Sequence, residues 1–328
     1  MRIFVTGGAG FIGSHLCRAA VAEGHAVDVM DNLSTGSRDN VADLIPNPIF
    51  QLIIADGSDQ SLVNSLVSKA DAVVHLAAAV GVQLVIDDPV RTLETNIDVT
   101  QGVLKACRDL GKRVLIASSS EVYGRGSQEW FRETDDLVIG PPTSRRWGYA
   151  ASKLVDEFLA LAYHYEHELP VTVLRLFNTV GPGQVGHYGM VIPRFVRRAL
   201  LGEAITVYGD GEQRRTFTGV DQVVKAILQL IECRESIGKI VNVGGTAETS
   251  INDLASAVIR ATKSKSVIEH IPYEKAYGES FEDMRRRNPD TKALKDLLGW
   301  APHSDLNAIL GPVIEDMRKR LKKEGVLS

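Results

Sequence analysis

The sequence predicts an α/β protein with a doubly wound parallel sheet and a smaller mixed lobe. Three observations lead to this prediction. Short apolar runs alternate with stretches of helical spacing in the first half of the chain, a glycine turn follows the first run, and a Gly- and Pro-rich segment separates two later runs. At 328 residues the chain is also long enough for one large domain with an added lobe.

Each apolar run is expected to form a strand, because it is short and rich in β-branched residues, as in a sheet that is buried on both faces. Helical spacing between the runs predicts βαβ units with right-handed crossovers. The helical stretches of the first half are Ser14 to Glu23, Ser61 to Ser68 and Thr92 to Leu110. The apolar runs begin at Arg2, Ala26, Gln51, Ala72, Arg113, Val171 and Lys239.

The second half of the chain contains the expected lobe. Residues 178–218 are rich in Gly and Pro around one helical stretch, Ile192 to Leu201, and turn residues of this kind mark loops over a pocket. The last stretch, from Ser250 to Ser328, is mixed helix and loop and ends in a Lys- and Arg-rich helix. We therefore expect a sheet domain of residues 1–177 and 219–245, and a lobe of residues 178–218 and 246–328.

A dinucleotide-binding turn is predicted at the end of the first strand. Gly7, Gly10 and Gly13 open the first helix, so a pyrophosphate can approach backbone N–H groups at the positive end of the helix dipole. Asp31 ends the second strand, where its carboxylate can accept both ribose hydroxyls of an adenosine and would repel a 2′-phosphate. The cofactor is therefore predicted to be NAD rather than NADP, on a sheet of the Rossmann type. Asp56 either contacts the adenine amino group or is an ordinary turn residue. Further cofactor contacts are expected from Phe11, Ile12, Asn32, Gly57, Leu76, Ala77 and Ala78.

Composition and charge argue against several other classes of protein. The net charge of −4 disfavours nucleic-acid binding, and the short basic run Arg285 to Arg287 is interpreted as a solvated face. Cys17, Cys107 and Cys233 lie far apart without CxxC spacing, so neither a metal site nor a disulfide framework is expected. No secretory signal or membrane-spanning stretch is evident, and a cytoplasmic location is predicted.

Two segments near the middle of the chain predict a site that oxidises an alcohol. Ser119 follows the fifth strand, and Tyr149 precedes Lys153 by four residues, which places both side chains on one face of a helix. The ammonium can then lower the pKa of the phenol from about 10 and make it a proton acceptor near neutrality. Ser119 can complete the hydrogen bond to the substrate hydroxyl. A Tyr and a Lys often meet at this spacing by chance, so the prediction depends on the accompanying cofactor motif.

The motifs together resemble a known family. With the glycine turn, Asp31, SerSerSerGluValTyrGly from Ser118 and the Tyr149 to Lys153 motif in this order, nearly the whole chain resembles the extended short-chain dehydrogenases/reductases of the nucleotide-sugar epimerase/dehydratase family. The resemblance implies a tightly bound NAD that takes a hydride from a sugar carbon and later returns it, with Ser119, Tyr149 and Lys153 as the catalytic triad. It also implies a UDP-sugar substrate, contacted at the diphosphate by Asn178, Arg215 and Arg287, at the uracil by Val207 and Tyr208, and at the sugar by Ser120.

The residue beside the triad bears on the reaction step that comes after the oxidation. The pair Ser120 and Glu121 resembles UDP-glucuronate decarboxylases, as do the stretches that begin at Arg146 and Tyr277. This resemblance favours oxidation at C4 and loss of CO2 with help from Glu121, which gives UDP-xylose or a 4-keto-pentose. The alternative is a UDP-sugar 4-epimerase, acting on UDP-glucose and UDP-galactose or on the corresponding hexuronates, in which Glu121 only binds substrate or is structural. Ser120 stands where 4,6-dehydratases have Asp, which disfavours dehydration, and the intact triad disfavours a non-catalytic NAD-sensing protein.

Two further expectations concern the substrate carboxylate and the assembly. Spacing alone does not identify the cation that would hold a hexuronate carboxylate, and Arg194 and His187 are the candidates. The resemblance implies a homodimer joined through helices at Thr92 to Leu110 and Gly148 to Glu168, whose apolar residues permit such a four-helix bundle.

Overall fold

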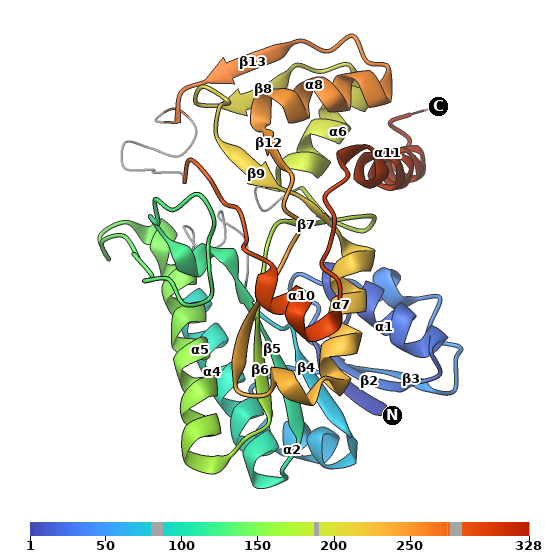
Figure 1. Cartoon of the computed structure of the whole chain (residues 1–328). Coiled ribbons are helices and arrows are strands. Elements are labelled where there is room, and N and C mark those ends of the chain that lie inside the picture. The colour runs from blue at the N-terminus through green and yellow to red at the C-terminus, as the bar shows by residue number, and fades with distance from the viewer. Residues whose placement is uncertain (80–87, 187–189, 274, 276–283, 328) are drawn as a thin grey trace.

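The centre of the molecule is a seven-stranded parallel sheet with the strand order β11-β6-β5-β4-β1-β2-β3, and a smaller lobe lies at one end of it (Figure 1). The computed structural model describes all residues except 80–87, 187–189, 274, 276–283 and 328. The strand order reverses between β1 and β4, and in such sheets ligands bind at the carboxyl ends of the strands beside this point. The strands are β1 (Arg2–Thr6), β2 (Ala26–Asp31), β3 (Phe50–Ile54), β4 (Ala72–His75), β5 (Arg113–Ser119), β6 (Val171–Leu176) and β11 (Lys239–Val243).

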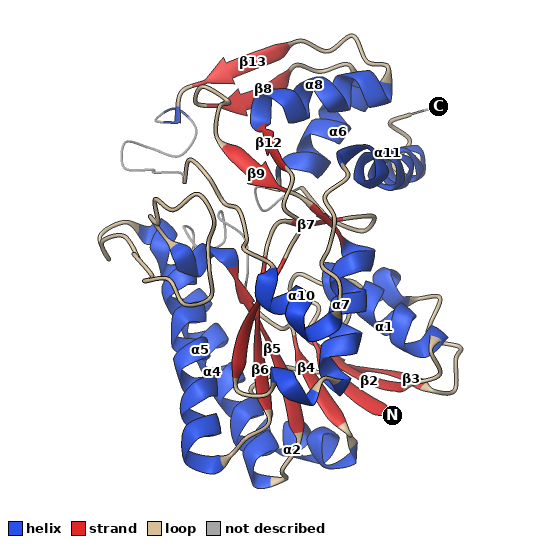
Figure 2. Cartoon of the chain, viewed as in Figure 1, coloured by secondary structure: helices blue, strands red, loops and turns tan. Residues whose placement is uncertain are grey.

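Helices cover both faces of this sheet, which explains why its strands are apolar on both sides (Figures 1 and 2). On one face, α1 (Phe11–Ala22), α7 (Val220–Glu232) and α10 (Lys292–Leu298) contribute to one hydrophobic cluster. On the other face, α2 (Gln60–Lys69), α4 (Pro89–Asp109) and α5 (Gly148–His167) contribute to a second cluster. The predicted fold class is confirmed, with each predicted strand and helix displaced by a few residues at most.

In the described part of the chain, short 3-10 helices lie in four of the connections. One of them, η2 (Ser120–Tyr123), directly follows β5, and another, η3 (Arg145–Trp147), directly precedes α5. The other two are η1 (Arg38–Val41) and η4 (Arg234–Ser236).

The smaller lobe has its own hydrophobic cluster, built from α6 (Val191–Leu201), α8 (Ile251–Thr262) and α11 (Leu306–Lys323) against short strands. Residues 178–218 were expected to form loops around one helix, but they also form strands. The reason is that Ile205 and Val207 pack into this cluster, a tertiary contact that a four-residue run does not reveal. The strand pairs are β8 (Ile205–Tyr208) with β13 (Ile268–Ile271), β9 (Arg214–Thr216) with β12 (Glu248–Ser250), and β7 (Thr179–Val180) with β10 (Thr218–Gly219).

Among the described residues, no helix combines the length and the apolar character that crossing a membrane requires.

Candidate active site

The turn after β1 brings backbone N–H groups to the start of α1. Gly7 has a φ of +73°, and a Cβ there would lie 2.8 Å from the backbone nitrogen of Ala77. A Cβ at Gly13, in the first turn of α1, would lie 2.2 Å from the carbonyl oxygen of Gly7. Only glycine fits these two positions, so the turn lies directly against the helix and its N-terminus can receive a phosphate.

The carboxylate of Asp31 is fixed at the end of β2. It accepts hydrogen bonds from the backbone N–H groups of Ala9, in the glycine turn, at 2.9 Å and of Leu33 at 2.8 Å. The neighbouring Asn32 donates to Asp56, just beyond β3, at 2.9 Å. Because a carboxylate offers about four lone-pair sites, Asp31 retains capacity for ribose hydroxyls in this orientation. These residues fit the adenosine half of NAD.

A single cavity of ≈ 660 Å³ is lined by strand ends of the sheet and by residues of the lobe. Of the residues that the sequence assigned to the cofactor, the reaction or the substrate, all line it except Val207 and His187, which lies outside the described residues. The individual roles of these residues stay predictions. On the cofactor side they are Gly7, Gly10, Phe11, Ile12, Gly13, Asp31, Asn32, Asp56, Gly57, Leu76, Ala77 and Ala78, and on the other side Ser119, Ser120, Glu121, Tyr149, Lys153, Asn178, Tyr208, Arg215 and Arg287.

The predicted triad is assembled where β5 and α5 meet. Ser119 is the last residue of β5, and its Oγ accepts a hydrogen bond from the Glu121 N–H at 3.2 Å, which caps η2. Tyr149 is the second residue of α5 and is hydrogen-bonded to the Ser119 side chain. Lys153 lies one turn further along α5, with 2 % of its surface exposed. The predicted proximity of these three side chains therefore follows from the strand end and the helix start.

The prediction that Lys153 brings the phenol of Tyr149 toward neutrality is wrong for this structure. Burial raises the pKa of Tyr149, and the negative charge of Glu121 raises it further. The hydrogen bond from Ser119 lowers this pKa but does not outweigh the other two effects. The negative charge of Asp156 also raises this pKa, and Asp156 is the partner of Lys153. The Nζ of Lys153 lies 3.0 Å from Oδ2 of Asp156, and both side chains are buried.

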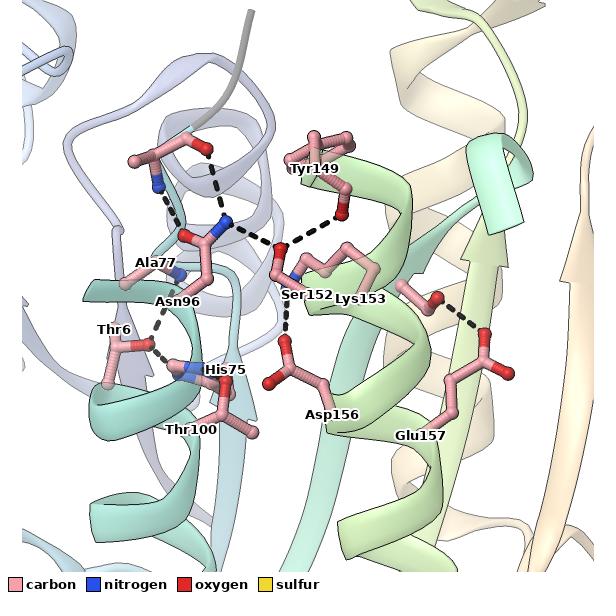
Figure 3. A network of polar contacts seen from close by, with 12 residues as sticks. Thr6, His75, Ala77, Asn96, Thr100, Tyr149, Ser152, Lys153, Asp156 and Glu157 are labelled. Carbon is pink, nitrogen blue, oxygen red and sulfur yellow. Dashed lines mark hydrogen bonds and ion pairs between the residues drawn. The ribbon is translucent and has the colours of Figure 1, made fainter. Parts of the chain in front are cut away.

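Behind this ion pair, a buried polar chain connects α4 with the sheet (Figure 3). Thr6 Oγ1 lies 2.7 Å from Nδ1 of His75, and His75 Nε2 lies 3.0 Å from Oγ1 of Thr100. Burial, helped by the positive charge of Lys153, lowers the pKa of His75 to about 3. His75 is therefore a neutral, hydrogen-bonded core histidine, and its Thr6 partner also accepts the backbone N–H of Ala77 at 3.3 Å.

A second set of bonds ties α5 to the loop after β4 (Figure 3). Asn96 of α4 accepts from the Ala79 N–H at 2.7 Å and donates to Ser152 Oγ at 3.1 Å. Ser152 in turn donates to the carbonyl oxygen of Tyr149 at 2.9 Å. The start of α5, and with it the phenol, is thus fixed relative to the loop that lines the cofactor side of the cavity.

Glu121 lies between two arginines at the same end of the cavity. Its Oε1 is 2.6 Å from Nη2 of Arg287, and its Oε2 is 3.2 Å from Nη1 of Arg146. All three side chains are mostly buried. Since Arg287 belongs to a segment far along the chain, this ion pair joins the lobe to the catalytic residues.

The residues assigned to the nucleotide lie on the lobe side of the cavity. Asn178 donates to the carbonyl oxygen of Thr216 at 2.9 Å. Val207 is fully buried in the core of the lobe, so a contact of this residue with the substrate would have to use its backbone. Its neighbour Tyr208 does line the cavity, because side chains alternate along β8.

Of the two residues expected to hold a sugar carboxylate, Arg194 lines the cavity and His187 is not described. The guanidinium of Arg194 stacks on Tyr208, 4.3 Å from the ring centroid, and donates to the Thr206 carbonyl at 3.3 Å. Arg194 therefore belongs to the part of the cavity that β8 lines. His187 lies outside the described residues.

Sequence reasoning missed the roles of Arg146, Asp156 and Asn96. Asp156 stands three residues after Lys153 on the same helix, so helical spacing could have identified their pairing. Arg146 is paired with Glu121, 25 residues earlier in the chain, so spacing did not indicate its role. No comparable signal exists for Asn96, because its partners Ala79 and Ser152 are distant in the sequence.

A glycine turn at a helix start, an acidic residue at the end of β2 and a Ser-Tyr-Lys set on one cavity are typical of an enzyme that uses NAD on a Rossmann-type sheet. The chain belongs to the NAD-dependent epimerase/dehydratase family, whose sequence profile matches residues 3–244. The predictions of the family, of an enzyme and of NAD as its cofactor are thereby confirmed.

Individual relatives show similarity over nearly the whole chain. It is 40% identical to the UDP-N-acetyl-alpha-D-glucosaminuronate decarboxylase of Bacillus cytotoxicus, over 92% of this chain and 93% of the relative. It is 35% identical to UDP-glucuronic acid decarboxylase 2 of Arabidopsis thaliana, over 99% of this chain and 71% of the relative. Among solved structures, the UDP-glucuronic acid 4-epimerase of Bacillus cereus, in complex with UDP-glucuronic acid and NAD, matches with a TM-score of 0.87 at 28% identity, over 98% of this chain and 100% of that one.

Proposed function

We propose that the protein is an NAD-dependent UDP-glucuronate decarboxylase that oxidises C4 of the sugar before CO2 leaves. The observation that carries this proposal is the position of Glu121. It lies close enough to Tyr149 for its charge to raise the pKa of that phenol, and Arg287 and Arg146 bind its two oxygens. The decarboxylase relatives support the same reaction.

The first step follows from the triad. Tyr149, hydrogen-bonded to Ser119, accepts the proton of the C4 hydroxyl. The glycine turn and Asp31 would hold NAD, which would supply the hydride acceptor for C4 and the hydride donor for the later reduction. A bound oxidised nicotinamide would add positive charge to the cavity that Tyr149 lines, which would favour the phenolate against the effect of burial.

The second step follows from the chemistry of the oxidised sugar. A C4 ketone is β to the C6 carboxylate, so the C5–C6 bond can break with its electron pair passing into an enolate as CO2 leaves. C5 then takes a proton from solvent, and the C4 ketone regains its hydride and the proton held by Tyr149. The net change is loss of CO2 and gain of one proton at C5. Ser120, which is 2 % exposed, and Glu121 line the wall beside this carbon and orient it.

A 4-epimerase is the second candidate, favoured by the structural match to the UDP-glucuronic acid 4-epimerase of Bacillus cereus. It would share the oxidation step. It would differ only in that the keto-sugar rotates in the site, so that the hydride returns to the opposite face of C4.

Proton NMR of purified protein with NAD tests the proposal. UDP-glucuronate, UDP-N-acetylglucosaminuronate, UDP-glucose and UDP-galactose are incubated in separate tubes, and the anomeric and ring signals are followed. We expect a UDP-pentose or 4-keto-pentose from one or both hexuronates, with Tyr149→Phe as the inactive control. Interconversion of gluco and galacto forms without loss of CO2 would show a 4-epimerase instead.

Three further proposals concern organisation. We propose a homodimer through α4 and α5, supported by exposed apolar side chains on α5, among them Phe158 and Tyr165. We propose a cytoplasmic location, supported by the free thiols of the three cysteines. We also propose the division into residues 1–177 with 219–245 and 178–218 with 246–328, supported by the separate hydrophobic cluster of the lobe, although Leu294 of α10 packs with the sheet.

A further inference from the structure

We infer that Arg146 is the residue that makes the site selective for acidic sugars, by binding the C6 carboxylate of the hexuronate. The inference rests on the proposed function, because it takes the hydroxyl at Tyr149 to be that of C4. It adds a determinant that neither the motifs nor the first candidates, Arg194 and His187, supplied.

The position of Arg146 in the chain places it beside the reacting carbon. It lies in η3, three residues before Tyr149, and lines the same cavity as Ser119, Ser120 and Glu121. In a hexuronate the carboxylate is attached to C5, the neighbour of C4. A side chain from an element adjacent to Tyr149 is therefore well placed to reach the carboxylate, and η3 directly precedes the helix that carries Tyr149.

Two contacts orient the guanidinium of Arg146. Its carbon Cζ lies 4.3 Å from the ring centroid of Trp147, so the indole supports one face of the cation. Its Nη1 lies 3.2 Å from Glu121 Oε2, so one edge is also fixed. Trp147 is itself 2 % exposed and packs against Gly140, where a Cβ would lie 2.0 Å from the indole Nε1. The support under Arg146 is therefore rigid.

The chemistry of this cation suits a carboxylate ligand. The Arg146 side chain is only 6% exposed, and a guanidinium carries five N–H donors in a fork. Contact with Glu121 is thus compatible with a second, bidentate contact to a sugar carboxylate. A neutral hexose would offer this buried charge only a hydroxymethyl group, which is a weaker partner. The contrast between the two sugars is the basis of the selectivity.

Binding measurements separate this role from a structural one. NAD-loaded Tyr149→Phe protein, which does not turn over, is titrated calorimetrically with UDP-glucuronate, UDP-glucose and UDP. We expect the Arg146→Gln change in this background to weaken UDP-glucuronate binding at least about tenfold, and to leave UDP-glucose and UDP within about twofold. The matched control is Arg145→Gln, the same substitution at the exposed neighbour in η3, which should change none of the three.

Several outcomes would overturn the inference. The first is that Arg146→Gln lowers the affinity for all three ligands equally, and the second is that it leaves the affinity for UDP-glucuronate unchanged. The third is that the protein with Arg146 intact shows no preference for UDP-glucuronate over UDP-glucose. If Arg146→Gln does not fold, Arg146→Lys replaces it, because lysine keeps the charge but lacks the forked N–H donors of the guanidinium. The inference again requires a loss of affinity that is confined to UDP-glucuronate. Selective binding without CO2 release would refute only the proposed reaction, whereas CO2 release with unselective binding would refute only the role of Arg146.

Discussion

The charge of one side chain, Glu121, sets a measurable property of the reacting phenol. Its negative charge raises the pKa of Tyr149, after the larger effect of burial. Only the phenolate accepts the C4 proton, so the oxidation rate rises with pH until Tyr149 is ionised. In Glu121→Gln this charge is absent and the pKa of Tyr149 falls. We therefore expect the rising limb of the pH–rate curve to move to lower pH, measured as NADH absorbance in a single turnover.

The control for this experiment is Glu129→Gln, which changes an exposed carboxylate paired with Arg286 and should leave the curve in place. A limb that stays fixed in Glu121→Gln, or moves to higher pH, would show that Glu121 does not act on Tyr149 electrostatically.

Spacing along the chain predicted which residues meet at the site but not their electrostatics. Tyr149 and Lys153 share a face of α5 because four residues nearly complete a helical turn. The pKa of Tyr149 instead depends on burial by residues distant in sequence and on Asp156, which pairs with Lys153. Burial is a property of the folded chain, so a motif could not supply it, whereas the three-residue spacing of Lys153 and Asp156 could have indicated their pairing.

The ion pair of Lys153 and Asp156 ties two neighbouring turns of α5. The exposed fractions of the two side chains are 3% and 0%, so solvent does not screen the charges. Asp156→Asn leaves a buried ammonium without its counter-ion, and we expect it to lower the free energy of unfolding by about 3–5 kcal/mol. Denaturant unfolding of the NAD-free protein measures this loss.

Adding Lys153→Met to Asp156→Asn removes both charges and should restore most of that stability. The exposed pair Lys292 and Asp296 serves as the comparison, and Lys292→Gln should have no measurable effect. A single Asp156→Asn variant as stable as the parent would contradict the prediction.

The close contact between the glycine turn and α1 gives a third prediction. In Gly13→Ala the new Cβ would meet the Gly7 carbonyl, a backbone atom that cannot move without shifting the turn. We expect NAD binding to weaken at least about tenfold, as measured by calorimetry. Gly311→Ala is the control, because a Cβ there meets nothing within 4 Å. It lies inside α11 and should stabilise the protein by about 0.5–1 kcal/mol without affecting NAD.

The long elements were predictable because their signal is local. Buried parallel strands give continuous apolar runs such as that of β6, and the glycine turn has a fixed spacing. The short strands β7 to β10 were not predictable, since two to four residues carry too little periodicity and their partner strands are distant in the sequence. The same limit hid η3, whose Arg146 acquires a partner only when β5 and α5 meet.

An apolar strip on the outside of α5 bears on the assembly. Val155, Phe158 and Tyr165 are 40%, 69% and 75% exposed, and Ala162 completes the same helical face. Exposed apolar strips of this kind mark protein–protein contacts. The strip lies on one of the two helices for which a homodimer was predicted, so we expect a dimer in solution by size-exclusion chromatography with light scattering.

Phe158→Asp places a charge in the middle of this strip and should convert the dimer to a monomer, because an unpaired carboxylate would be buried at the interface. Val267→Asp is the matched control, since Val267 is also apolar and 61 % exposed but lies in the lobe beside β13, and it should leave the dimer intact. NAD binding by both variants shows that they remain folded. A dimer that survives Phe158→Asp would place the interface elsewhere, and a monomeric parent protein would refute the dimer itself. If the monomer also retains turnover, each cavity is complete within one chain.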